Sequence, residues 1–175
     1  MPERVRREPE REIGDSPPVR TPVPPRLGSN RMSEIAWGDP DGGLRLGLAA
    51  AGGSLEVSLA NVGDKPLTVL SYIATGGRDH LDWFTVTLAG GADRPHQLQF
   101  IDDRDRSAKV REELEPGGSL THVIDLADWA ARPINAGRPL AAGHYRATAS
   151  YQVEGEPGAW TGRLDSGETK FSLPG

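Results

Sequence analysis

The last third of the chain, residues 114–173, alternates apolar and polar side chains in three segments that glycine and proline separate. A strand with one buried face repeats apolar residues at every second position. The inward positions on this rule are Leu120, His122, Ile124 and Leu126, then Tyr145, Ala147, Ala149 and Tyr151, then Thr169, Phe171 and Leu173. The period of two predicts antiparallel strands that each place one face on a shared core.

Comparable segments occupy most of the chain after residue 43. Strands are predicted over 44–48, 55–59, 67–73, 84–88, 98–100, 119–126, 145–151, 160–164 and 168–173. Residues 127–132 are expected to form one helical turn capped by Asp125. The charged segment 102–113 is expected to form a loop or a ragged sheet edge. About eight or nine strands at short spacing predict an all-β, immunoglobulin-like antiparallel β-sandwich with at most one short helix.

The first 33 residues differ in composition from the rest. They hold seven of the 15 prolines and few apolar side chains, so we expect a disordered Pro/Arg-rich arm over 1–33 and one β-sandwich domain over 34–175. The run PPVRTPVPPR offers a polyproline II segment for an aromatic groove, although a solvated tail is the simpler interpretation. Met32 directly precedes the ordered pattern and is an alternative first residue.

Charge is unevenly divided between the arm and the domain. Residues 1–31 carry seven Arg against five acidic residues, a net +2, which leaves 13 basic against 20 acidic residues and a net −7 beyond them. The domain lacks the Lys and Arg cluster that phosphate neutralisation requires, so nucleic acid is not an expected partner. The chain has no cysteine, no visible secretory signal and no apolar run of membrane length. We therefore expect a cytoplasmic protein that has no membrane partner.

Several short motifs resemble known sandwich domains. The segments IAWGDPDGGLRLGL, LEVSLANVGDKPLTV, LEPGGSLTHVIDL, PLAAGHYRATASY and AWTGRLDSGETKFSL are similar to immunoglobulin-like β-sandwich domains of uncharacterised bacterial proteins. The Asn turn, the Leu-x-Pro-Gly turn and the Gly-x-Tyr strand start are also distantly similar to the bacterial intracellular proteinase inhibitor domain. The resemblance covers about residues 35–173 and implies the fold alone, because its motifs are turn and packing devices. Tyr145 is expected to bury its ring near a sheet corner.

Asp102, Asp103 and Asp105 suggest a hard cation such as calcium, which favours several carboxylate oxygens. Two observations count against it. Arg104 and Arg106 interrupt the run, and a calcium loop started at Asp103 would have Ala and Leu where Gly and Glu are required. The four histidines, at positions 80, 96, 122 and 144, lack the spacing of a zinc site. We predict no metal and no cofactor.

The chain contains no Gly-x-Ser-x-Gly motif, so serine-hydrolase chemistry is not expected and we predict that the protein is not an enzyme. Tryptophans dominate binding hot spots. Trp129 lies in a connection between strands and is expected to be partly exposed, and Trp83 less strongly so. The alternative for both is packing as a lid over one end of the sandwich. The candidate contact residues are Trp83, Trp129, Asp102, Asp103 and Asp105.

These observations predict a non-catalytic accessory or interaction domain. It would act through protein–protein contacts, on loops at one end of the sandwich or on an exposed sheet face. An intracellular proteinase inhibitor is one alternative, with residues 76–82 or 102–111 as an extended inhibitory loop. A carbohydrate-binding module is a second alternative and a metal-dependent enzyme a third. The identity of the partner and the oligomeric state stay open.

Overall fold

The computed structural model describes residues 33–75, 78–90, 93–98, 109–135 and 139–174, and these hold twelve β-strands, one short α-helix and one 3-10 turn. The elements are β1 (Ala36–Trp37), β2 (Leu44–Ala51), β3 (Ser54–Asn61), β4 (Leu67–Thr75), β5 (Arg78–His80), β6 (Phe84–Gly90), β7 (Asp93–Leu98), β8 (Lys109–Leu114), β9 (Ser119–Asp125), α1 (Leu126–Ala130), η2 (Pro133–Asn135), β10 (Gly143–Val153), β11 (Gly162–Asp165) and β12 (Thr169–Leu173). The predicted all-β class with one short helix is confirmed. The arm predicted over residues 1–33 lies outside the described residues, Ser33 excepted.

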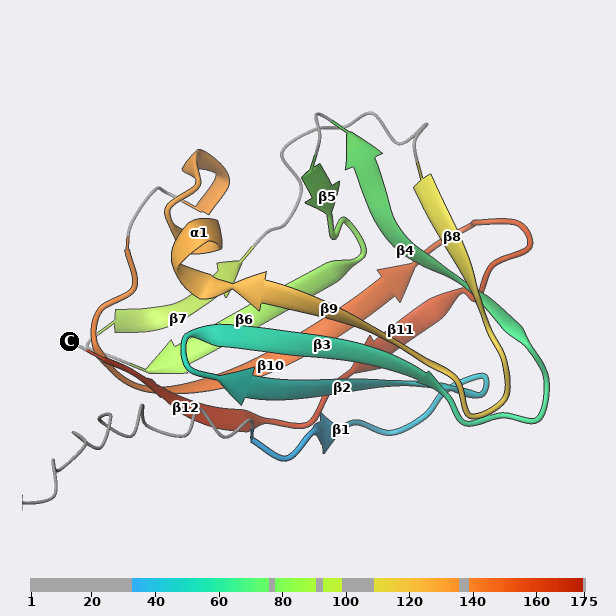
Figure 1. Cartoon of the computed structure of the whole chain (residues 1–175), viewed down its shortest axis with the longest axis horizontal. Helices are drawn as coiled ribbons and strands as arrows, with labels where there is room; N and C mark the ends of the chain where they lie inside the picture. Colours follow the sequence, from blue (N-terminus) through green and yellow to red (C-terminus); the bar gives the residue numbers. More distant parts are fainter. Residues whose placement is uncertain (1–32, 76–77, 91–92, 99–108, 136–138, 175) are drawn as a thin grey trace, which may run out of the picture.

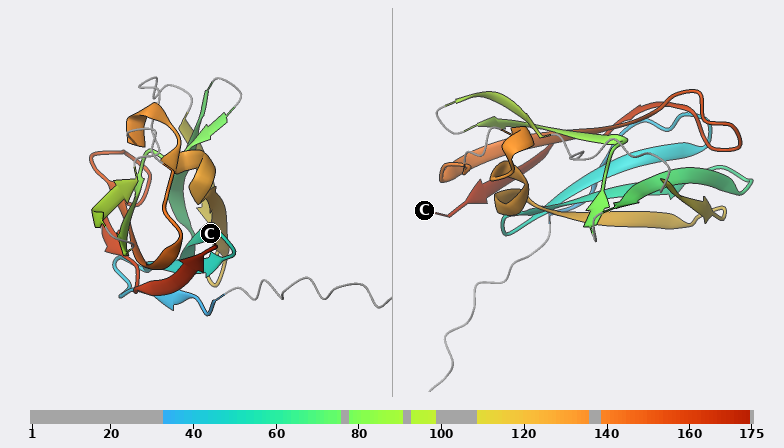
Figure 2. Two further views of the ribbon diagram at one scale, coloured as in Figure 1. Left: turned by 90° about the vertical axis from the view of Figure 1, so that its left-hand side faces the viewer. Right: turned by 90° about the horizontal axis from the view of Figure 1, so that it is seen from above.

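The strands form three antiparallel sheets (Figure 1). Their orders are β1-β2-β3-β9, then β11-β10-β6-β7 with β12 also on β10, and β5-β4-β8. Seen from above in Figure 2, β6, β7 and β10 lie in one layer and β3 and β9 in the other. The strand count exceeds the predicted eight or nine partly because β1 and β5 contain only two and three residues. Within the described ranges, no helix has the length and apolar character that a bilayer crossing needs.

The core lies between these layers and follows the predicted alternation. On β10, Tyr145, Ala147, Ala149, Tyr151 and Val153 are buried, whereas most of the residues between them are exposed. Across the core, β2 and β3 contribute buried leucines and Val57. The inward faces predicted for these strands are therefore confirmed, because burial of apolar surface fixes which face of a strand turns toward the other layer.

Strands β11 and β12 extend one behind the other along the same edge of β10. Residues 150–153 of β10 pair with β11 and residues 143–147 pair with β12. Ser166 bridges the gap, because its N–H donates to Ala149 O and its Oγ accepts from Ala149 N, both at 2.8 Å. Gly167 N then donates to Ala36 O of β1 at 3.1 Å, which joins this edge to the opposite layer.

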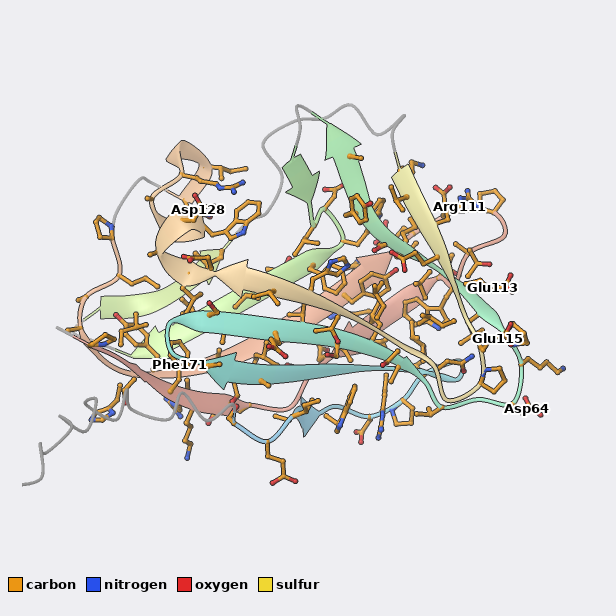
Figure 3. The ribbon with its side chains drawn as sticks, viewed as in Figure 1. Asp64, Arg111, Glu113, Glu115, Asp128 and Phe171 are labelled. Carbon is orange, nitrogen blue, oxygen red and sulfur yellow. The ribbon has the colours of Figure 1, made fainter. Side chains whose placement is uncertain are left out.

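The charged segment 102–113 was expected to be a loop or a ragged edge. The loop expectation is wrong for its described part, because residues 109–113 belong to β8, which pairs with β4 and forms the edge of that sheet. Leu114 is buried, and the side chains of Lys109 and Arg111 both bind Glu156. Burial and ladder hydrogen bonds thus hold a charged segment as a strand, while its charges face solvent at the sheet edge (Figure 3).

The helix predicted after Asp125 is confirmed. The Asp125 carboxylate accepts a hydrogen bond from Asp128 N at 2.9 Å and caps α1. Leu126, Trp129 and Ala130 are buried on one face of this helix because residues three and four positions apart lie on the same side. The helix therefore closes one end of the sandwich.

Candidate functional site

Trp129 was expected to be partly exposed, and this expectation is wrong. Its side chain is only 6% exposed, because α1 turns it onto the core beside Leu126. The Arg132 guanidinium covers the ring, with its Cζ 3.3 Å from the ring centroid. Trp129 is therefore the lid over the sandwich end that was the alternative interpretation.

The other predicted contact residues are not brought together. Trp83 is half-buried and packs against the core, while its carbonyl accepts a hydrogen bond from Gln152 N at 2.9 Å. Asp102, Asp103 and Asp105 lie outside the described residues, so their contact role stays a prediction. The described residues contain no group of three metal-ligating side chains.

Two of the four histidines have described side chains. His144 is exposed on the outer face of β10. His122 lies between the layers, where its Nε2 is 3.0 Å from Ser71 Oγ and its ring meets Tyr72 and Phe84 edge to face. A nucleophilic serine must meet its substrate, and Ser71 is 0% exposed. The pair is therefore a polar link between β4 and β9.

The regions named for the alternative functions also have defined places. Residues 78–80 of the first candidate inhibitory loop form β5, hydrogen-bonded to β4, and residues 109–111 of the second belong to β8. These parts are paired strands rather than extended loops. For sugar binding, Trp160 is buried with its Nε1 donating to Asp41 O at 3.1 Å, and Trp37 is half-buried with the Arg45 guanidinium 4.2 Å from its ring centroid. Burial therefore restricts stacking on Trp160, and Arg45 occupies one face of Trp37.

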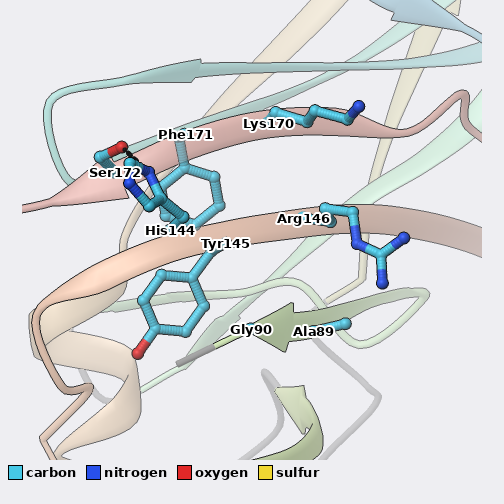
Figure 4. A pocket seen from close by; sticks show the side chains of 8 residues that line it. All are labelled: Ala89, Gly90, His144, Tyr145, Arg146, Lys170, Phe171 and Ser172. Atoms are coloured by element: carbon cyan, nitrogen blue, oxygen red, sulfur yellow. Dashed lines mark hydrogen bonds between the residues drawn. The ribbon is translucent and has the colours of Figure 1, made fainter. Parts of the chain in front are cut away.

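Basic side chains gather instead on the outer face of β10 and β12, around a shallow pocket of about 500 Å³ (Figure 4). His144 and Arg146 point outward from β10, and Lys170 and Ser172 point outward from β12. We call these four residues the cationic face. All four are exposed, since they occupy the positions that alternate with the buried residues of the two strands.

Register places two cations of this face directly opposite each other. Arg146 pairs with Lys170, and His144 pairs with Ser172, whose Oγ is 2.8 Å from His144 Nδ1. Like charges that face each other across two strands destabilise a sheet. The compensation is weak, because Glu168 Oε2 lies 3.8 Å from Arg146 Nη1 and the two side chains are 42% and 61% exposed. Among the described residues, no ion pair involves Lys170.

Several other cations in the described ranges have closer acidic partners. Lys109 Nζ lies 2.7 Å from Glu156, Arg132 lies 2.6 Å from Asp128, and Arg163 lies 3.0 Å from Asp165. These contacts have the expected effect on ionisation. The hydrogen bond from Lys109 lowers the pKa of Glu156, and the hydrogen bond to Asp165 raises the pKa of Arg163. The charges of Lys109, Arg132 and Arg163 are thus balanced by close carboxylates, whereas the charges of the cationic face are not.

A rigid aromatic pair supports the cationic face from below. Tyr145 and Phe171 are opposite each other in register, and their rings stack with centroids 5.5 Å apart and planes 18° apart. The Tyr145 hydroxyl donates to Ala141 O at 2.7 Å, which fixes the ring. Gly90 ends β6 with φ 141°, and a Cβ there would lie 2.2 Å from His144 O. Only glycine allows β6 to approach β10 this closely.

The part of the outer face that β10 shares with β6 is neutral and polar next to these residues. Hydroxyl residues pair across β10 and β6, namely Thr148 with Thr87 and Ser150 with Thr85. A flat surface of short hydroxyl side chains therefore adjoins the cationic face. Such a surface can accept and donate hydrogen bonds to a partner, while the cationic face supplies charge for carboxylates.

Sequence reasoning missed this face. The alternation that identified Tyr145 and Phe171 as inward also placed His144, Arg146, Lys170 and Ser172 outward, so that signal was available. Their cross-strand opposition required the register between two segments more than twenty residues apart. No protein-family model matches the chain, and no curated protein matches it significantly.

Proposed function

We propose that this protein is a non-catalytic interaction domain that binds an acidic segment of a protein partner on its cationic face. The observation that carries the proposal is the direct opposition of Arg146 and Lys170, beside His144, on a domain with a net charge of −7 beyond residue 31. Positions where a fold accepts an unfavourable local arrangement are typical of functional sites. A bound carboxylate between the two cations would relieve their repulsion.

The fold supports this role. The Tyr145 hydroxyl bonds back to Ala141, two residues before β10 begins, which is the geometry of the tyrosine corner in immunoglobulin-like sandwiches. We therefore propose the immunoglobulin-like class for the domain, as the motif resemblance implies. Sandwiches of this kind commonly present loops or a sheet face to partners, and here the sheet face bears the charge.

Peptide binding tests the proposal. A fluorescent decapeptide of alternating Glu and Ser would be titrated against the full chain, with a Gln and Ser decapeptide as the neutral comparison. We expect binding of the acidic peptide alone, and weaker binding as salt concentration rises, because exposed charge pairs are screened. The double variant Arg146→Gln/Lys170→Gln should weaken it about 2- to 30-fold, from about 0.2–1 kcal/mol for each exposed pair.

Arg163→Gln is the matched control. Arg163 is an exposed arginine on β11 of the same sheet, but its charge is already paired with Asp165. We expect its removal to leave the affinity for the acidic peptide unchanged. Equal loss in this control and in the double variant would show nonspecific attraction and would count against the proposal, as would equal binding of the acidic and the neutral peptide.

A further inference from the structure

A second hollow lies at the end of the sandwich that α1 closes. It measures about 500 Å³ and is mostly apolar, with Leu126, Ala127, Ala131, Pro139, Leu140 and Leu173 among its lining residues. Leu140 and Leu173 are half-buried, and Ala127, Ala131 and Pro139 are exposed. Asp125 is the one charged residue that lines it within the described part of the chain. We call this hollow the end groove.

The N-terminal arm joins the domain next to the end groove. Ser33 N donates to Ala50 O at 2.9 Å, Ala50 N donates to Ser33 Oγ at 2.7 Å, and Ser33 Oγ lies 3.1 Å from Thr169 Oγ1. Ser33, the first described residue, therefore lies between β2 and β12. Gly52 lies two residues beyond Ala50 and Leu173 four residues beyond Thr169, and both line the groove. Figure 1 shows α1, the β2–β3 turn and the C-terminus at this same end.

The segment just before Ser33 has the chemistry that the groove accepts. Residues 17–27, PPVRTPVPPRL, contain five prolines together with Val19, Val23 and Leu27. Residues 16–33 carry three arginines and no acidic residue, whereas the domain carries net −7 and Asp125 lies at the groove. A proline-rich segment loses little conformational entropy when it binds a groove, because its extended helix is already formed.

The segment is also long enough to reach. Leu27 lies six residues before Ser33, and a polyproline II helix rises about 3.1 Å per residue, so six residues span about 19 Å. The four steps along β12 from Thr169 to Leu173 span about 13 Å at about 3.3 Å per residue. We propose that residues 17–27 occupy the end groove of their own molecule and cover its apolar lining. This inference does not depend on the proposed function, because no residue of the cationic face lines the groove.

Paramagnetic broadening tests the proposal on the full chain. The protein has no cysteine, so Val23→Cys provides a single site for a nitroxide label. We expect the label to remove the amide NMR signals of Gly53, Ala127 and Leu140 and to leave those of Gly117 and Gly155 at the opposite end. Retention of the groove signals, or equal loss at both ends, would overturn the proposal.

Two lysine variants of the labelled chain make the test specific. Ala127→Lys fills the groove and adds a charge that repels the arm, so it should restore the groove signals. Thr161→Lys adds the same side chain at an exposed position at the other end and should leave the broadening unchanged. A mixed sample shows whether the arm instead binds the groove of a second copy. In it, one chain carries the nitroxide but no isotope, and the other carries the isotope but no nitroxide, so NMR observes only the second chain. Groove signals lost in that mixture would overturn occupation within one molecule.

Discussion

The Tyr151 hydroxyl makes two hydrogen bonds to the backbone of one residue, Leu70. It accepts from Leu70 N at 3.0 Å and donates to Leu70 O at 2.8 Å. The pairing of β4 with β8 is irregular between Leu70 and Tyr72. The Tyr151 hydroxyl thus provides hydrogen-bond partners for the Leu70 backbone where the β4–β8 pairing is irregular. The same bonds link β10 to β4 through the core.

Tyr151→Phe should destabilise the fold by about 1–3 kcal/mol, because it leaves the buried N–H and C=O of Leu70 without this partner. Urea unfolding of the variant and the wild type would measure the difference. Tyr145→Phe is a useful comparison, since it removes one hydrogen bond at a part-buried site and should cost less. A loss at Tyr151 no larger than at Tyr145 would contradict the role given to the double contact.

Alkaline stability should also depend on Tyr151. Burial raises the pKa of its hydroxyl above the ordinary value of 10.0. A raised pKa contributes stability that is complete below pH 10 and is lost as pH rises toward the folded-state value. We expect the stability of the wild type to fall faster than that of Tyr151→Phe above pH 10. Parallel unfolding curves for the two proteins from pH 9 to 11 would argue against this.

Acid stability should depend on Glu156. The hydrogen bond from Lys109 and the charges of Lys109 and Arg111 lower its pKa below the ordinary value of 4.5. A depressed pKa contributes stability that is present above pH 4.5 and is lost as pH falls through the folded-state value. Wild type should therefore melt at a higher temperature than Glu156→Gln at pH 7, with the gap narrowing below pH 4.5. A gap that does not change with pH would be the contrary result.

Gly90→Ala should disturb the base of the cationic face. The new Cβ would lie 2.2 Å from His144 O, on a backbone with φ 141°. We expect a loss larger than the about 1–3 kcal/mol that a strained backbone costs by itself, because the clash with His144 O adds to it, together with weaker binding of the acidic peptide. Gly117→Ala is the control, because its φ is 79° and no atom lies within 4 Å of the added Cβ. Gly117→Ala has the backbone strain of Gly90→Ala but not its clash with His144 O. An equal loss of stability in both variants would therefore show that the close approach of β6 to β10 is not the cause.

Much of the fold could be predicted from the sequence because burial sets a period of two. That period placed Tyr151 and Ala149 inward, and the Asp125 cap marked the start of α1. Trp129 could not be placed in the same way. A position in a connection suggests exposure, but a single helical turn carried the ring onto the core. Local position was outweighed by the burial of a large apolar surface.

The cationic face depends on the register between β10 and β12, and the sequence of one strand alone does not determine that register. A slip of one residue between β10 and β12 would move Arg146 away from Lys170 and turn one set of side chains to the other face. The same holds for β8, where pairing with β4 converts a charged segment into an edge strand. The cytoplasmic location and the contact role of Asp102, Asp103 and Asp105 stay predictions.

Lys170→Gln, measured for stability and for binding on the same sample, tests the cationic face most directly. Because it removes one of two opposed like charges, we predict a gain of about 0.2–1 kcal/mol in the free energy of unfolding. The same change should weaken binding of the acidic peptide, since a cation that contacts it is lost. A loss of stability in Lys170→Gln would contradict the repulsion between Arg146 and Lys170. An affinity for the acidic peptide equal to that of the wild type would contradict its binding on the cationic face.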